Sequence, residues 1–130
     1  MNGRFLPSLV AALVGLLLAG CKDGTEFTVS EHNNTVIERL QRQLASTPAN
    51  KNLEFRRADS YRSAFTYLDA YGKTWVRRVT ILLEWQQPKV TRIVIRGERV
   101  ESGMFTSSSQ RLPELERQVQ QTLFPSHNRQ

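Results

Sequence analysis

Residues 74–100 read TWVRRVTILLEWQQPKVTRIVIRGERV, and this stretch decides the fold. From about Thr74 to Trp85, apolar and aromatic side chains recur at every second position apart from Arg77, which is the period of a half-buried strand. The segment QQPK at 86–89 is typical of a turn, and the alternation resumes from Val90 to Val100. The sequence therefore predicts a long antiparallel hairpin.

The two faces of this hairpin differ in polarity. The first collects large apolar side chains, namely Trp75, Val79, Ile81, Leu83 and Trp85 from one strand and Ile93 and Ile95 from the other. The second carries Arg78, Arg92 and Arg96, with Leu82 and Val94 among them. We expect the first face to be buried. The second predicts either a cationic stripe for phosphate or carboxylate groups, or a solvated surface.

Weaker strand patterns precede the hairpin. Leu53 and Phe55 alternate with charged residues in one short strand, and β-favouring residues recur from Tyr61 to Leu68. The second segment also fits a helix ended by Gly72, so 61–71 is open between strand and helix. The sequence DAYGK at 69–73 resembles a hairpin connection, which favours the strand.

A helical pattern flanks the strands on each side. The first helix is expected from about Ser30 to Ala45, with a stripe of Val36, Ile37, Leu40 and Leu44. The stripe lacks large aromatic residues, so packing on the sheet is favoured over lying on a membrane. The second helix is expected from Pro113, a residue suited to a first turn, and ends before Pro125. The serine-rich segment 102–110 is predicted to be a loop.

These elements predict an α+β fold. We expect a small antiparallel meander of three to four strands, with the amino-terminal and carboxy-terminal helices packed on one face. About 110 residues follow position 20, which suffices for one domain. That single domain is expected over residues 30–125, with a frayed tail at 126–130.

The only cysteine of the chain closes an apolar run that begins after Arg4. This charged start, the apolar core and the small residues before Cys21 are the three parts of a secretory signal, and the core is too short to span a bilayer. Leu18, Ala19, Gly20 and Cys21 match, position by position, the cleavage motif of bacterial lipoprotein precursors. The first 25 residues therefore resemble such a precursor.

The resemblance implies how the chain is processed and where it is held. Residues 1–20 would be a cleaved signal peptide, Cys21 the acylated first residue of the mature chain, and 21–29 a lipidated tether. Because each buried methylene contributes about 0.8 kcal/mol, several acyl chains hold such an anchor in the membrane. Lys22 rather than aspartate follows the cysteine, which by the same resemblance favours the outer membrane, facing the periplasm.

The net positive charge of the chain limits the classes of partner that it can bind. Removing Arg4 with the signal peptide reduces the formal net charge from +6 to +5. An exported basic chain does not meet nucleic acid, so we expect an envelope protein or an anionic envelope ligand such as lipopolysaccharide, an anionic lipid or a wall polymer. One cysteine provides no disulfide framework.

Catalytic and metal-binding patterns are not found in the sequence. The two histidines, His32 and His127, have no second metal ligand at helical or hairpin spacing, and they are expected to be solvated. A nucleophile triad lacks its parts. The carboxylates of Glu84, Glu98 and Asp59 lie close to basic residues in sequence, which favours ion pairing over glycoside cleavage. We therefore expect no enzyme, no metal and no cofactor.

Three functional hypotheses remain. The first is a non-enzymatic, membrane-anchored lipoprotein that acts as an accessory or scaffold by binding another envelope component. The second is a binder of an anionic envelope ligand through Arg78, Arg92 and Arg96. The third is an immunity or inhibitor lipoprotein, which the same features allow.

Overall fold

The computed structural model describes residues 24–125 as an α+β fold. Along the chain the elements are β1 (Thr25–Val29), α2 (Asn33–Ala45), β2 (Lys51–Arg57), β3 (Arg62–Tyr71), β4 (Trp75–Gln87), β5 (Val90–Ser102), β6 (Ser107–Arg111) and α3 (Pro113–Leu123). The signal motif at Leu18 to Cys21 and the tail at 126–130 lie outside the described residues.

The strands form one antiparallel sheet of six strands, in the order β1-β5-β4-β3-β2, with β6 also paired to β5. The long hairpin predicted from residues 74–100 is confirmed as β4 and β5, with Ile81 opposite Ile95. Strand β5 is long enough to pair with two short strands along one edge. Strand β1 lies along residues 91–95 and β6 along residues 98–102.

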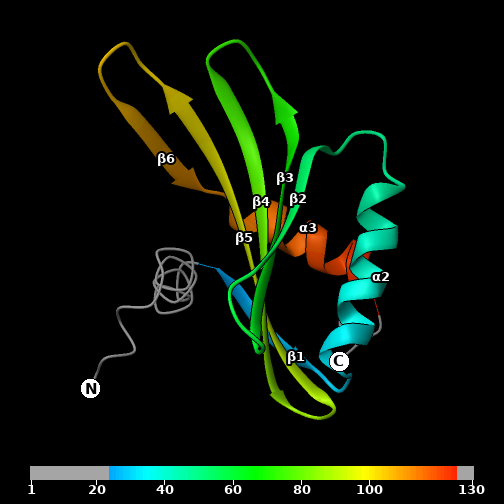
Figure 1. Ribbon diagram of the computed structural model, residues 1–130. Coiled ribbons are helices and arrows are strands. Elements are labelled where there is room, and N and C mark those ends of the chain that lie inside the picture. The colour runs from blue at the N-terminus through cyan, green and yellow to red at the C-terminus, as the bar shows by residue number, and fades with distance from the viewer. Residues whose placement is uncertain (1–23, 126–130) are drawn as a thin grey trace, which may run out of the picture.

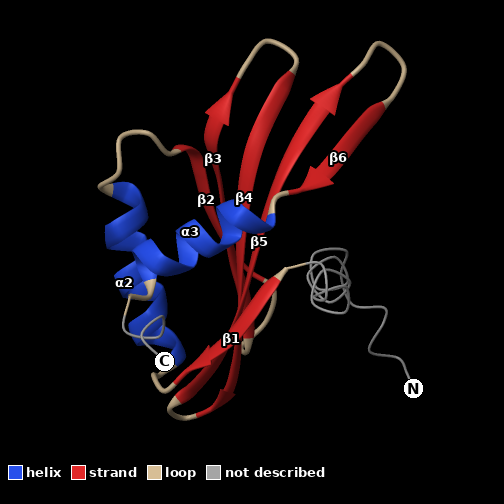
Figure 2. Cartoon of the chain, turned by 180° about the vertical axis from the view of Figure 1, so that it is seen from behind, coloured by secondary structure: helices blue, strands red, loops and turns tan. Residues whose placement is uncertain are grey.

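Both helices lie on the same face of the sheet, as the sequence predicted (Figures 1 and 2). The core forms between this inner face and the helices, because alternate residues of each strand point toward them. It combines Phe65, Val79, Ile81, Leu83, Ile93 and Ile95 from the strands with Val36, Leu40, Leu115 and Val119 from the helices. The apolar face predicted for the hairpin is therefore the buried one.

The prediction of three to four strands was wrong, because two short edge strands were missed. Residues 25–29 are strand β1 and not part of a tether. They alternate in burial around Phe27, whose ring packs edge-on against Phe124 at a centroid distance of 5.1 Å. Strand β6 lies in the segment expected to be a loop, and its side chains are mostly exposed. Backbone pairing to β5, rather than an apolar pattern, holds it in the sheet.

Residues 62–71 are strand β3, so the favoured strand interpretation of this segment is confirmed and the helical alternative was wrong. One boundary differs from expectation. Helix α2 begins at Asn33 rather than at Ser30, because the chain bends at residues 30 and 31 after strand β1. His32 caps it: the imidazole Nδ1 accepts a hydrogen bond from the backbone N–H of Asn34 at 3.0 Å.

Helix α3 is fixed to the sheet by a buried carboxylate. Glu116 is fully buried, and it accepts hydrogen bonds from the Thr25 hydroxyl at 2.9 Å and from the Gly97 backbone N–H at 3.0 Å. The Arg111 guanidinium donates to it at 2.8 Å. One side chain of α3 therefore holds β1, β5 and β6 together, which stabilises the edge where the two short strands lie.

Candidate functional site

The arginines singled out in the sequence lie together on the outer face of the sheet, which we define as the face opposite the helices. Arg78 of β4 and Arg92 and Arg96 of β5 all occupy outer-face positions, with Leu82 and Val94 between them in the register. The alternation in the sequence was therefore sufficient to place these residues on one surface.

The outer face is not a purely cationic stripe. Glu98 accepts from Arg78 at 2.9 Å and lies 3.7 Å from the guanidinium of Arg96. Arg92 donates to Glu26 at 2.6 Å and to Glu84 at 3.1 Å. Three arginines thus face three glutamates, and their formal charges cancel. An anion bound here would compete with carboxylates that already hold these guanidinium groups.

A small apolar cluster accompanies the ion pairs. Ala64 of β3, Leu82 of β4 and Val94 of β5 pack across the three central strands on the outer face, with Ala58 against them. The cluster is separate from the main core, which lies on the inner face. Leu82 and Val94 are each 2% exposed and Ala64 is 9% exposed, so the cluster lies beneath the charged side chains of this face.

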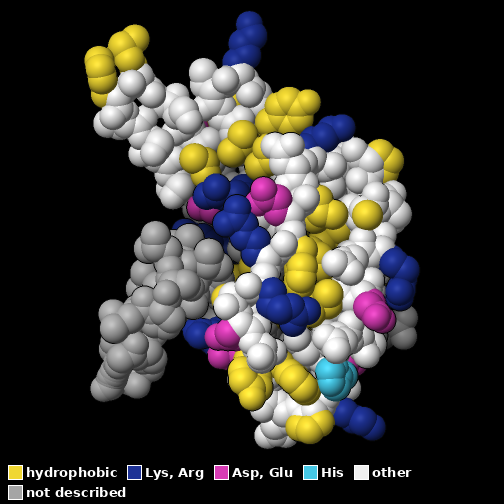
Figure 3. Space-filling view, in the orientation of Figure 1, with side chains coloured by type: hydrophobic (Ala, Val, Ile, Leu, Met, Phe, Trp, Pro, Cys, Tyr) yellow, Lys and Arg dark blue, Asp and Glu magenta, His cyan; other side chains and the backbone are white. Residues whose placement is uncertain are grey.

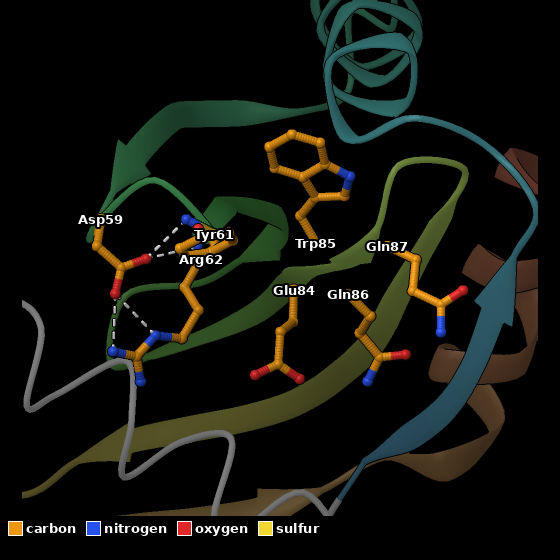
Figure 4. Close-up of a pocket in the computed structure, with 7 residues that line it drawn as sticks. All are labelled: Asp59, Tyr61, Arg62, Glu84, Trp85, Gln86 and Gln87. Atoms are coloured by element: carbon orange, nitrogen blue, oxygen red, sulfur yellow. Dashed lines mark hydrogen bonds and ion pairs between the residues drawn. The ribbon is translucent and has the colours of Figure 1, made fainter.

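A second candidate site is an open hollow where β4 ends (Figure 4). It has a volume of about 500 Å³ and is lined by Asp59, Tyr61, Arg62, Glu84, Trp85, Gln86 and Gln87. Figure 4 shows the Glu84 and Gln86 side chains on the opposite side of the strand from the Trp85 ring. The hollow presents side-chain amides, a carboxylate and an exposed phenol, which suit hydrogen bonding to a polar group.

Asp59 organises one wall of this hollow. One carboxylate oxygen accepts from the backbone N–H groups of Tyr61 and Arg62, both at 2.8 Å, and the other accepts from the Arg62 guanidinium at 2.8 Å. Partial burial alone would raise the pKa of Asp59. The hydrogen bonds from Arg62 and the two backbone groups outweigh it and hold the pKa below the ordinary value of 3.8. Asp59 therefore serves as an ionised support for the turn.

A cluster of aromatic side chains lies beside the hollow. The Trp85 ring lies 4.6 Å from the His32 ring and 6.0 Å from the Tyr61 ring, measured between centroids. His32 is thus partly buried against Trp85, whereas the sequence predicted a solvated side chain. The buried indole N–H of Trp85 has no hydrogen-bond acceptor among the described residues.

The histidine and carboxylate side chains of the described residues are the candidates for metal binding and acid–base chemistry. No group of three or more His, Asp or Glu side chains within residues 24–125 is placed to hold a metal ion. Glu84 and Asp59 both accept from arginine, and His32 is engaged as a helix cap.

The sequence pattern predicted that the three arginines share one face, but it did not predict the hollow. The hollow joins the connection before β3 to the last residues of β4, and no motif spans the two. One local signal was available in DSYR at 59–62, where an aspartate followed by turn residues and an arginine three positions on predicts a closed turn.

No helix within residues 24–125 has the length and hydropathy needed to cross a membrane. Comparisons with protein-family models, with curated proteins and with solved structures find no match for this chain.

Proposed function

We propose that this protein is a lipid-anchored lipoprotein of a bacterial envelope, without catalytic activity, whose domain binds another envelope component as an accessory or scaffold. The observation that carries the proposal is the motif Leu18-Ala19-Gly20-Cys21 at the end of an apolar run. Cys21 is the proposed acylation site, and Lys22 favours the outer membrane facing the periplasm.

The outer face supports a protein as the bound component. Its surface is formed by paired charges of both signs, which lie over the buried apolar side chains of Ala64, Leu82 and Val94. A protein surface with charged groups of both signs complements such a face, whereas a polyanion complements unpaired arginines. Binding of an anionic ligand through Arg78, Arg92 and Arg96 is therefore the second candidate.

The anchor is tested by the intact mass of the protein in membrane fractions from cells that express wild type or Cys21→Ala. We expect the wild-type mass to begin at Cys21 and to include acyl chains, because only the cysteine thiol accepts the first lipid. The variant should lack this species. An unmodified wild-type mass would contradict the anchor and, with it, the envelope assignment.

The binding face is tested by site-specific photo-crosslinking in the same cells. Thr66 lies on the outer face opposite Thr80, while Gln41 is exposed on α2 and is the matched control. A crosslinker at Thr66 should capture a discrete envelope protein that the crosslinker at Gln41 does not capture. Equal capture at both positions, or none at Thr66, would count against the outer face.

A further inference from the structure

The most exposed large hydrophobic side chains of the described residues lie at the ends of two hairpins. Met104 and Phe105 are 89% and 91% exposed between β5 and β6, and Tyr71 is 61% exposed where β3 ends. The two hairpins project side by side beyond both helices (Figure 1), and hydrophobic side chains stand at the outermost end of one (Figure 3). We call residues 71–75 and 102–107 the hairpin tips.

The tip between β5 and β6 belongs to an uncharged segment with a paired backbone. Residues 102–110, SGMFTSSSQ, contain no charged side chain, although 23% of the chain is charged. Ser102 pairs with Ser107, and the Gly103 backbone N–H donates to the Thr106 carbonyl at 2.6 Å. Such a tip can move from water into lipid without burying a charged side chain, and the backbone of its turn is already hydrogen-bonded.

The neighbouring tip carries interfacial residues. Tyr71 and Lys73 are exposed, and the Arg99 guanidinium lies 4.4 Å from the ring centroid of Trp75. Gly72 permits a close turn, because a Cβ there would lie 2.1 Å from the Trp75 indole nitrogen. Aromatic and basic side chains of this kind are enriched at the boundary between a membrane and water.

The position of β1 relates the tips to the amino-terminal chain. Because β1 is antiparallel to β5, the chain enters Thr25 from the side toward which the tips point. From Ile95, opposite Thr25, to Ser102 the strand rises roughly 23 Å at about 3.3 Å per residue. The four residues from Cys21 to Thr25 reach at most about 14 Å. The tips thus extend at least about 9 Å beyond the reach of the tether, which is comparable to the depth of an interfacial contact.

We propose that the hairpin tips insert Met104, Phe105 and Tyr71 into the interfacial layer of the phospholipid bilayer that holds the anchor. This inference rests on the proposed function, which supplies the acylated Cys21. A single myristoyl chain binds membranes with an association constant of only about 10⁴ M⁻¹. Three side chains bury no more apolar surface than such a chain does. Insertion is therefore reversible and depends on the high local concentration that a short tether provides.

The test uses the purified lipidated protein in vesicles of phosphatidylethanolamine and phosphatidylglycerol. Acylation consumes the Cys21 sulfur, so a Thr106→Cys substitution provides the only free thiol for an environment-sensitive fluorophore. Lys89→Cys, exposed in the turn at the opposite end of the sheet, is the matched control. We expect nitroxide-labelled lipid to quench most of the emission at position 106 and little at position 89.

A second variant isolates the side chains. Met104→Ser with Phe105→Ser, introduced beside the Thr106→Cys label, should reduce quenching to the level at Lys89→Cys. Both residues are almost fully exposed, so the fold does not depend on them. Equal quenching at both labels, quenching unaffected by the double substitution, or shielding that appears only when envelope proteins are added would each overturn insertion. The last result would identify the tips as a protein contact.

Failure of the anchor and failure of insertion give different results. Acyl chains in the intact mass together with an unquenched label at position 106 would overturn insertion and leave the anchor in place. A mass without acyl chains would contradict the proposed function. Because insertion depends on the tether, such a mass would overturn insertion as well.

Discussion

Glu116 is a carboxylate without exposed surface at the point where α3 meets three strands. Its oxygens accept from Thr25, Gly97 and Arg111, so its charge is balanced by one guanidinium and by hydrogen bonds from neutral groups. Buried charges are tolerated only with such partners. The loss of Glu116 would remove one shared acceptor from Thr25, Gly97 and Arg111 at once, so this residue contributes to the stability of the edge formed by β1 and β6.

Substituting Glu116→Gln should reduce the free energy of unfolding by about 2 to 4 kcal/mol, because the amide keeps the shape but cannot neutralise Arg111. Urea denaturation followed by circular dichroism measures the change. Glu114→Gln is the control, since Glu114 forms an exposed pair with Arg117 and should have little effect. Equal stability of the two variants would show that the buried network contributes nothing.

The pairs of the outer face illustrate what residue-level prediction could and could not reach. Alternation placed Arg78, Arg92 and Arg96 on one face, since it depends only on the period of a strand. Their partners depended on register: Glu98 is 20 positions from Arg78, and Glu26 is 66 positions from Arg92. Register follows from turns and bulges, which the composition of a strand does not specify.

Among the elements, the long ones were predictable and the short ones were not. Strands β4 and β5 have 13 residues each, so their alternation repeats often enough to be recognised. Strands β1 and β6 have five each. The first was obscured by its closeness to the proposed anchor. The second has no apolar period, because it is held by backbone hydrogen bonds to β5.

The packing of α3 on β5 depends on the absence of a side chain at Gly97. A Cβ there would lie 3.1 Å from the Leu115 side chain and 3.3 Å from the Leu112 carbonyl. Gly97→Val should therefore push α3 from the sheet and cost about 1 to 3 kcal/mol, measured by thermal or urea unfolding. Thr28→Val, an exposed position on β1, is the matched control. A Gly97→Val protein as stable as the control would refute close packing.

On the scale of the whole molecule, the core on the inner face is continuous from Phe27 to Phe124. Tyr67 lies within it, whereas Tyr61 and Tyr71 are exposed. Burial, with a smaller contribution from Asp69, raises the pKa of Tyr67. Its ionisation therefore requires that the core opens, so that one phenol links the stability of the entire fold to alkaline pH.

The raised pKa of Tyr67 determines how the free energy of unfolding changes with pH. Because the folded pKa is raised above the unfolded value of about 10, the stability from neutral Tyr67 is fully present below that pH and is lost as pH rises further. Tyr67→Phe should flatten the fall in unfolding free energy between neutral pH and about pH 11, and Tyr71→Phe should not. Urea titrations across this range decide it, and parallel curves for all three proteins would contradict it.

The antiparallel ladder between β1 and β5 also determines how the molecule carries a mechanical load. A pull on the chain ahead of Thr25, in the direction of the tips, acts along the strand axis and stresses all five rungs of the ladder in shear at once. The backbone hydrogen bonds between β1 and β5 must then break together. Under a pull perpendicular to the strands they would break one at a time. A pull at this point therefore meets high resistance to unfolding, because the force enters along a strand that is paired to β5 over its whole length.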